Sequence, residues 1–133
     1  MISLDTNVIV RLFVDDGSHQ QIKAARKAAL EAKQVFITQI VQVELIWVLS
    51  EAYEFGKPQV LQVLHELNEN KAFVLQSSNQ FSQALKLFEM SNADFSDCLM
   101  LMESKQSDSI PVYTFDKRFA KQPDVQLLTA ESK

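Results

Sequence analysis

The sequence is poor in glycine, proline and cysteine. Of its 133 residues, two are glycine, three are proline and one is cysteine. Two glycines cannot supply a glycine-rich phosphate-binding loop or the dinucleotide-binding glycine fingerprint. No serine-centred nucleophile elbow is present either. The single cysteine, Cys98, cannot form an internal disulfide, so nothing in the sequence calls for an oxidising compartment. We expect Cys98 to be a small apolar residue on a helix.

Long apolar runs and an excess of basic residues are also missing. The most apolar run, residues 40–49, is too short to span a bilayer and contains Gln42 and Glu44. No targeting signal is recognised near Met1, so we expect a cytoplasmic protein without a membrane segment. The net charge of −4, from 17 acidic and 13 basic residues, argues against a broad basic surface that coats nucleic acid. The net charge is still compatible with an enzyme that binds phosphates through metal cations, because a carboxylate cluster contributes negative charge until its metal is bound.

Short strands alternate with helices along the sequence. The hydrophobic pattern predicts strands at residues 2–4, 35–37, 72–75, 112–114 and 125–128, with helices in each interval up to the fourth strand. These helices are expected at residues 8–13, 19–32, 39–53, from 58, 80–90 and 95–105. Such alternation predicts an α/β fold, a three-layer sandwich whose central, mostly parallel sheet of four to five strands is flanked by helices. With no linker or repeat, residues 1–133 are expected to form a single domain.

Three residues mark expected helix ends. Ser18 is predicted to be the N-cap of the helix that runs through Ala32. Gly56 lies where a helix C-cap is expected, and Pro58 suits the first turn of the following helix.

Two carboxylates follow predicted strands. Asp5 comes after the first strand and Asp116 after the fourth. In an open α/β sheet, functional residues collect at the carboxyl ends of the strands. An aspartate in this position can also simply cap the following helix, and the sequence leaves both interpretations open for Asp5 and Asp116.

Glu44 lies in the middle of an apolar helix. Its neighbours three and four residues away are Ile40, Val41, Trp47 and Val48, all of them apolar. We therefore expect the carboxylate to project from a buried face, where an unpaired charge is costly unless a cation or hydrogen-bond donors meet it. A metal site is favoured over a buried ion pair with a lysine or arginine.

Asp94 and Asp97 are three residues apart and so share one face at the start of a helix. Asp94 is the natural N-cap, and Asp97 would then complete a loose capping box. Asp97, one turn inside the helix, is explained less well by capping, and for this residue we favour a functional role.

The set of acids determines which metal is expected. Oxygen ligands without a paired histidine or cysteine suit Mg²⁺ or Mn²⁺ and not zinc. His19 and His65 lie on different elements without metalloprotease spacing, and we expect them to be surface or packing residues. Clustered carboxylates raise one another's pKa, an effect that a divalent cation reverses. Such a cluster can hold one or two ions that bind a phosphodiester.

Four motifs together resemble those of the PIN-domain nucleases, specifically the VapC-type toxins of bacterial and archaeal toxin–antitoxin pairs. The first is Leu-Asp-Thr-Asn-Val at residues 4–8, and the second is Val-Glu-Leu-Ile-Trp-Val-Leu at residues 43–49, followed by Tyr53. The third is Asp-Phe-Ser-Asp-Cys-Leu at residues 94–99, and the fourth is Thr-Phe-Asp-Lys-Arg-Phe at residues 114–119. One departure is Cys98, where the family often has alanine.

The resemblance implies a PIN-like sandwich and a metal-dependent endoribonuclease. Asp5, Glu44, Asp97 and Asp116 would be the catalytic, metal-binding quartet, which Thr6 and Asn7 orient by hydrogen bonds. Asp94 would be an auxiliary acid on the face of Asp97. Mg²⁺ or Mn²⁺ as cofactor, an RNA substrate, a homodimer and a cognate antitoxin that covers the site are also implied. Basic residues near the acids are candidates for holding RNA phosphates: Arg11, Lys117 and Arg118. For Lys117 and Arg118, a solvated turn is an equal alternative.

Two other functions remain as alternatives. A haloacid-dehalogenase-like phosphatase also places an aspartate after its first strand, but it needs a second one two residues on, where this chain has Asn7. A PIN-like fold could also act as a non-catalytic binding module. The presence of all four acids argues against that interpretation.

Overall fold

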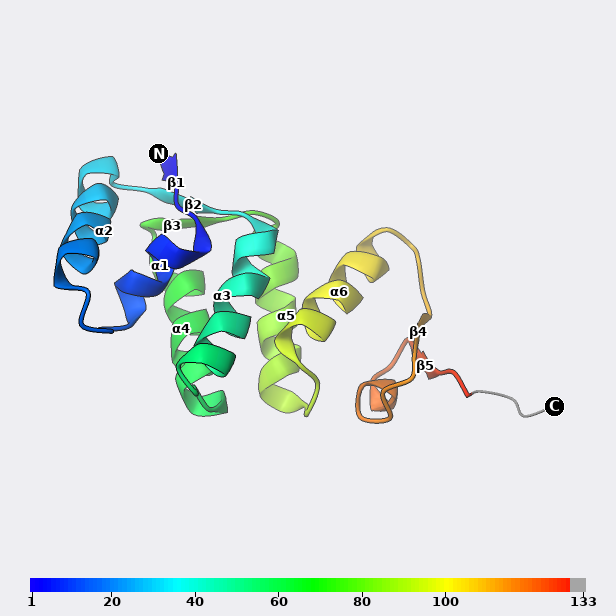
Figure 1. The fold of residues 1–133 in the computed structure, drawn as a ribbon. Helices are drawn as coiled ribbons and strands as arrows, with labels where there is room; N and C mark the ends of the chain where they lie inside the picture. Colours follow the sequence, from blue (N-terminus) through cyan, green and yellow to red (C-terminus); the bar gives the residue numbers. More distant parts are fainter. Residues whose placement is uncertain (130–133) are drawn as a thin grey trace. The chain divides into compact units, whose positions relative to one another are not determined.

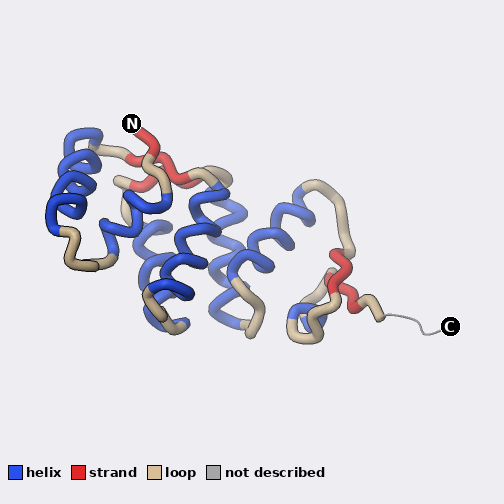
Figure 2. The backbone as a smooth tube through the Cα atoms, in the orientation of Figure 1, coloured by secondary structure: helices blue, strands red, loops and turns tan. Residues whose placement is uncertain are grey.

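The computed structural model describes residues 1–129. Within them, strands and helices alternate as the sequence predicts (Figures 1 and 2). The strands are β1 (Ile2–Ser3), β2 (Val35–Ile37), β3 (Phe73–Leu75), β4 (Val112–Thr114) and β5 (Val125–Leu127). The helices are α1 (Thr6–Phe13), α2 (His19–Ala32), α3 (Gln39–Ala52), α4 (Lys57–Glu69), α5 (Ser78–Met90), α6 (Phe95–Gln106) and the short 3-10 helix η1 (Phe119–Lys121). Each of these α-helices and strands matches an expected element to within a few residues.

The chain divides into two compact units, Met1–Ser78 and a second that starts at Asn79. The first contains a three-stranded sheet in the order β1-β2-β3, and the second contains the pair β4-β5. Every pairing is parallel, as predicted. Within residues 1–129, the first unit thus pairs three strands and the second pairs two, and the mixed α/β architecture with parallel strands agrees with the predicted fold class.

The first unit is built around β2, its central strand. Val35 pairs with Ile2 and Phe73, and Ile37 pairs with Leu75. Val35 and Ile37 are buried, as expected for a strand covered on both faces. Helix α1 packs against α2 and α3, and α4 contacts α3 and β3 (Figure 1). The core side chains of these helices are Ile9, Val10, Ile22, Ala25, Val41, Leu45, Ile46, Leu49, Val60, Val63, Leu64 and Leu67.

The second unit has an aromatic core. The ring of Phe95, at the start of α6, meets Phe81 at a centroid distance of 5.4 Å and Phe88 at 6.0 Å, both edge to face. This geometry is favourable for aromatic pairs. Strand β4 pairs with β5 in the register Val112 to Val125 and Thr114 to Leu127.

Two of the expected helix caps differ from the structure. Gly56 is not a C-cap: it is the N-cap of α4, with extended backbone, and its N–H donates to the side chain of Gln59 at 2.9 Å. Helix α3 ends at Ala52, with Tyr53 as its C-cap, and Pro58 lies in the first turn of α4 as predicted. Ser18 occupies the N-cap position of α2, but its hydroxyl bonds Asp16 and makes no capping bond to the helix.

None of the helices between residues 1 and 129 is long and apolar enough to cross a membrane.

Candidate active site

Asp5 caps the first helix. It follows the end of β1 and takes the N-cap position of α1, where its Oδ1 accepts the N–H of Val8 at 3.1 Å. The cap uses one carboxylate oxygen and leaves Oδ2 on an exposed residue for a further ligand. The capping interpretation of Asp5 is therefore confirmed, and it is compatible with a functional one.

The expected burial of Glu44 is wrong. Glu44 is exposed, and so are Ile40 and Trp47, at 69% and 65%. The buried face of α3 is formed instead by Val41, Gln42, Leu45, Ile46 and Leu49. Helix α3 is apolar around most of its circumference, so the pattern could not tell which face turns inward.

The Glu44 carboxylate is held by a hydrogen bond from α1. The Thr6 hydroxyl donates to Oε1 of Glu44 at 3.0 Å, across 38 residues of sequence. Thr6 is the first residue of α1, directly after Asp5. One residue pair therefore joins the end of β1 to the middle of α3.

Arg11 is engaged inside the first unit. Its guanidinium donates to the Asn7 carbonyl at 2.7 Å and to the Gln21 side chain at 2.8 Å, and it pairs with Asp16 at 3.5 Å. These contacts tie α1 to α2 and to the loop between them. A surface groove of about 630 Å³ lies along α1 and α2 beside Asp5 and Asn7, with Arg11 in its lining.

Gln42 is a polar residue whose role the sequence did not reveal. It is completely buried, and its Nε2 donates to the carbonyls of Ile37 at 3.1 Å and Gln76 at 3.0 Å. These carbonyls lie at the carboxyl ends of β2 and β3, so Gln42 joins α3 to the edge of the sheet where functional residues collect. The sequence signal for this burial was the position of Gln42 beside Val41 and Leu45 on one face of the helix.

Asp97 lies in the first turn of α6 and has other acids nearby. Partial burial raises the pKa of Asp97, and the negative charges of Asp94 and Asp116 raise it further. Asp94 takes the N-cap position of α6, but its side chain accepts no capping hydrogen bond. The capping box expected for Asp94 and Asp97 is therefore not formed, and both carboxylates are left for other partners.

Asp116 organises the turn after β4. Its Oδ1 accepts the N–H groups of Arg118 at 2.8 Å and Phe119 at 3.3 Å, and its own N–H donates to the Thr114 hydroxyl at 3.0 Å. Asp116 is thus a cap of the turn that leads into η1, as one of its two interpretations predicted. Lys117 and Arg118 are both exposed in this turn.

Each unit brings two of the four predicted acids onto neighbouring elements. Asp5 and Glu44 are linked through Thr6 in the first unit, and Asp97 and Asp116 interact electrostatically in the second. None of the four forms an ion pair with a lysine or arginine in residues 1–129. In that same range, no group of three or more histidine, cysteine, aspartate or glutamate side chains is placed to hold a metal ion.

Comparison with known proteins agrees with the resemblance seen in the sequence. The family model described as "PIN domain" matches residues 2–125. A "VapC ribonuclease" from Aquifex aeolicus is 23% identical over 122 residues, which cover 89% of this chain and 89% of that protein.

Proposed function

This chain belongs to the PIN-domain family, and we propose that it is a metal-dependent endoribonuclease that hydrolyses RNA phosphodiester bonds. Asp5, Glu44, Asp97 and Asp116 would be its catalytic, metal-binding quartet. The observation that carries the proposal is that none of these carboxylates is paired with a cationic side chain in residues 1–129. The likeness to a ribonuclease over nearly the whole chain supports the reaction class.

The donor set fits a hard divalent cation. All four side chains offer carboxylate oxygens, the ligands that Mg²⁺ and Mn²⁺ prefer. Partial burial raises the pKa of Asp97, and the neighbouring carboxylates of Asp94 and Asp116 raise it further, as expected of acids that lie together without a cation. When bound, such a cation lowers the pKa of a water and stabilises charge on the phosphate oxygens.

The remaining residues of the site would hold the acids in place. Thr6 donates to Glu44 and so limits the directions in which that carboxylate can point. The cap at Val8 fixes the side chain of Asp5, and the amides of Arg118 and Phe119 fix that of Asp116. Asp94 would be an auxiliary acid beside Asp97. Ligands held in advance lose less entropy when a cation or a phosphate binds.

The basic residues of the turn after Asp116 would bind the substrate backbone. Lys117 and Arg118 are exposed and sit next to a quartet member, where they would contact RNA phosphates. Arg11 is half-buried and already bound to Asp16, Gln21 and Asn7, which favours a structural role for it. Asn7 borders the groove along α1 and α2 and would support the site from there.

The biological setting we propose is that of a toxin in a toxin–antitoxin pair. The chain would act in the cytoplasm as a homodimer and be silenced by a cognate antitoxin that covers the acids. The four motifs of the family support this setting. The lone, buried Cys98 is consistent with a reducing compartment.

Cleavage of end-labelled RNA by the purified protein tests the proposal. Products should appear with Mg²⁺ or Mn²⁺ and disappear with EDTA or in Asp97→Asn. Asp108→Asn is the matched control, because Asp108 is an exposed acid in the same unit with no proposed role. It should cut like the parent protein.

Any of three results would contradict the proposal. Cutting that survives EDTA would mean that the carboxylates do not act through a cation. Equal activity of Asp97→Asn and the parent protein would remove Asp97 from the chemistry. A folded protein that cuts no RNA and whose melting temperature does not rise with Mn²⁺ would indicate a non-catalytic binding module.

A further inference from the structure

The first turn of α3 is tied to the ends of two strands by a pair of glutamines. The Nε2 of Gln42 donates to the carbonyl of Ile37, at the end of β2, at 3.1 Å, and to that of Gln76, directly after β3, at 3.0 Å. In return, the Gln76 side chain accepts the N–H of Gln39, the first residue of α3, at 2.8 Å. We call Gln42 and Gln76 the glutamine pair.

The sheet that holds the glutamine pair also places the residue that bonds Glu44. Strand β1 pairs with β2 and leads through Asp5 into Thr6, while β2 runs into the start of α3 (Figure 1). The Thr6 hydroxyl donates to Glu44 of α3. One sheet therefore positions both ends of this hydrogen bond, Thr6 through β1 and Glu44 through the glutamine pair. All of these residues lie in the first compact unit, Met1–Ser78.

Gln42 and Glu44 point to different sides of α3. Two residues apart in an α-helix, they are separated by about 200° of rotation around the axis. Gln42 is completely buried against the strand ends, whereas Glu44 is bonded to Thr6 of α1. Any rotation or shift of α3 that breaks the bonds of Gln42 therefore also moves the Glu44 carboxylate relative to Thr6.

The amide of Gln42 contributes orientation more than stability. Its Oε1 is buried and accepts no hydrogen bond within residues 1–129. An unpaired buried acceptor lowers stability, and an apolar side chain of similar size would avoid that cost. The two bonds from Nε2, however, allow only one orientation of α3 on the strand ends, which apolar packing by itself does not enforce.

We propose that the glutamine pair positions Glu44 for metal binding, an inference that rests on the proposed function. Gln42 and Gln76 are positioning residues, which act through the orientation of α3 and not by contact with the cation. Releasing either one lets the Glu44 carboxylate leave the direction in which Thr6 holds it. The cation then binds more weakly, because its ligand must be ordered at the moment of binding.

The test is the Mn²⁺ concentration that gives half-maximal RNA cleavage, together with the Mn²⁺ affinity measured by calorimetry without RNA. Gln42→Met keeps the length of the side chain but removes the amide. Gln76→Leu removes the acceptor for the Gln39 N–H at an exposed position, so this second variant should fold. Gln76→Glu keeps an acceptor at the N-terminus of α3 and is the matched conservative variant.

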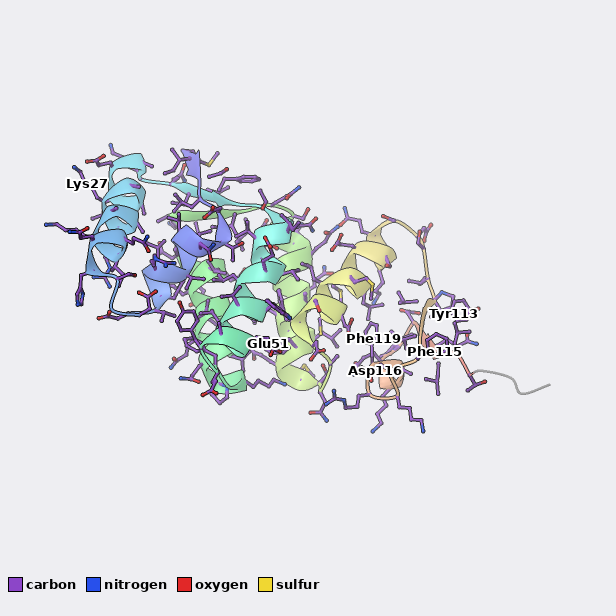
Figure 3. All side chains as sticks on the ribbon, in the orientation of Figure 1. Lys27, Glu51, Tyr113, Phe115, Asp116 and Phe119 are labelled. Atoms are coloured by element: carbon purple, nitrogen blue, oxygen red, sulfur yellow. The ribbon has the colours of Figure 1, made fainter. Side chains whose placement is uncertain are left out.

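Two controls on α3 separate positioning from stability and from charge. Leu49 is completely buried on the same face of α3 as Gln42, about two turns further along the helix. Glu51 is an exposed acid near the other end of α3, as Figure 3 shows. Leu49→Ala should lower the melting temperature, yet Leu49→Ala and Glu51→Gln should both need as much Mn²⁺ as the parent protein.

Gln42→Met and Gln76→Leu should each need about 2- to 30-fold more Mn²⁺, the span over which packed networks pass an effect to another site. At saturating Mn²⁺ their cleavage rates should approach that of the parent protein, because every proposed ligand remains. Gln76→Glu should behave like the parent. Gln42→Met combined with Thr6→Val should lose less than the product of the two single losses, because both changes release the same carboxylate.

Three results would overturn the positioning role: an unchanged Mn²⁺ requirement in Gln42→Met and Gln76→Leu, an equal increase in Leu49→Ala, or independent losses in the double variant. If the parent protein cuts RNA with Mn²⁺, these results refute only the role of the glutamine pair. A parent protein that neither binds Mn²⁺ nor cuts RNA refutes the proposed nuclease, and the positioning role with it.

Discussion

Replacing Thr6 by valine should weaken the metal site without unfolding the protein. Valine has nearly the same shape as threonine but lacks the hydroxyl that donates to Oε1 of Glu44 at 3.0 Å. The variant leaves every proposed ligand in place. It removes only the hydrogen bond that fixes the direction in which the Glu44 carboxylate points.

The expected size of the effect follows from the surroundings of this hydrogen bond. A hydrogen bond to a charged group contributes about 1.5–3 kcal/mol. Thr6 is half-buried and Glu44 is exposed, so water can replace much of the lost bond and the lower end applies. About 1.4 kcal/mol corresponds to a factor of ten. Partners of metal ligands typically contribute about 10- to 100-fold to metal affinity or activity, so we expect roughly a tenfold loss.

The assay is the Mn²⁺ concentration that gives half-maximal RNA cleavage. Thr6→Val should need about ten times more Mn²⁺, and at saturating Mn²⁺ its rate should approach that of the parent protein. Thr6→Ser keeps the hydroxyl and is the matched control, so it should behave like the parent. In EDTA, urea unfolding should show that Thr6→Val loses no more than about 1.5 kcal/mol.

An unchanged Mn²⁺ requirement in Thr6→Val would show that the bond to Glu44 does not serve the metal site. Equal impairment of Thr6→Ser would mean that the methyl group, and therefore packing, is what matters.

Three further predictions concern charge and packing. Burial and neighbouring acids raise the pKa of Asp97 above 3.8, so the metal-free protein should lose stability as the pH rises through that raised pKa. Asp97→Asn should abolish this loss and also the rise in melting temperature with Mn²⁺, as thermal melts across pH would show. Hydrogen bonds from Ser18 lower the pKa of Asp16, so its stabilising contribution should be lost only as the pH falls through the lowered value. Ser18→Ala should return that pKa toward its ordinary value in an NMR titration, and an unchanged pKa would refute the assignment. Gln42→Ala should cost about 2–4 kcal/mol of unfolding free energy, because it removes one buried and one partly buried hydrogen bond and leaves a cavity. Urea unfolding against the exposed-site control Gln62→Ala measures this cost, and equal stability of the two variants would contradict it.

Local signals placed the elements in sequence. The apolar runs at residues 35–37 and 112–114 are strands with the predicted bounds, because short blocks of β-branched and aromatic residues favour extended chain. Asp5 caps α1 through its own side chain, an interaction that spans three residues and so is encoded locally. The sequence also predicted which four acids form the candidate quartet, because each lies in a short motif of neighbouring residues.

Contacts between distant residues were decided by tertiary structure alone. Helix α3 has apolar residues on several sides, and only its packing determined that Leu45 is buried while Trp47 and Glu44 are exposed. The hydrogen bond between Thr6 and Glu44 joins residues that no local pattern relates. Partial burial of Asp97 beside Asp94 and Asp116 raises its pKa, and the spacing of these residues in the sequence does not determine how deeply Asp97 is buried. Local conformation depends on each residue and its near neighbours, whereas burial and charge coupling depend on which surfaces the whole chain brings together.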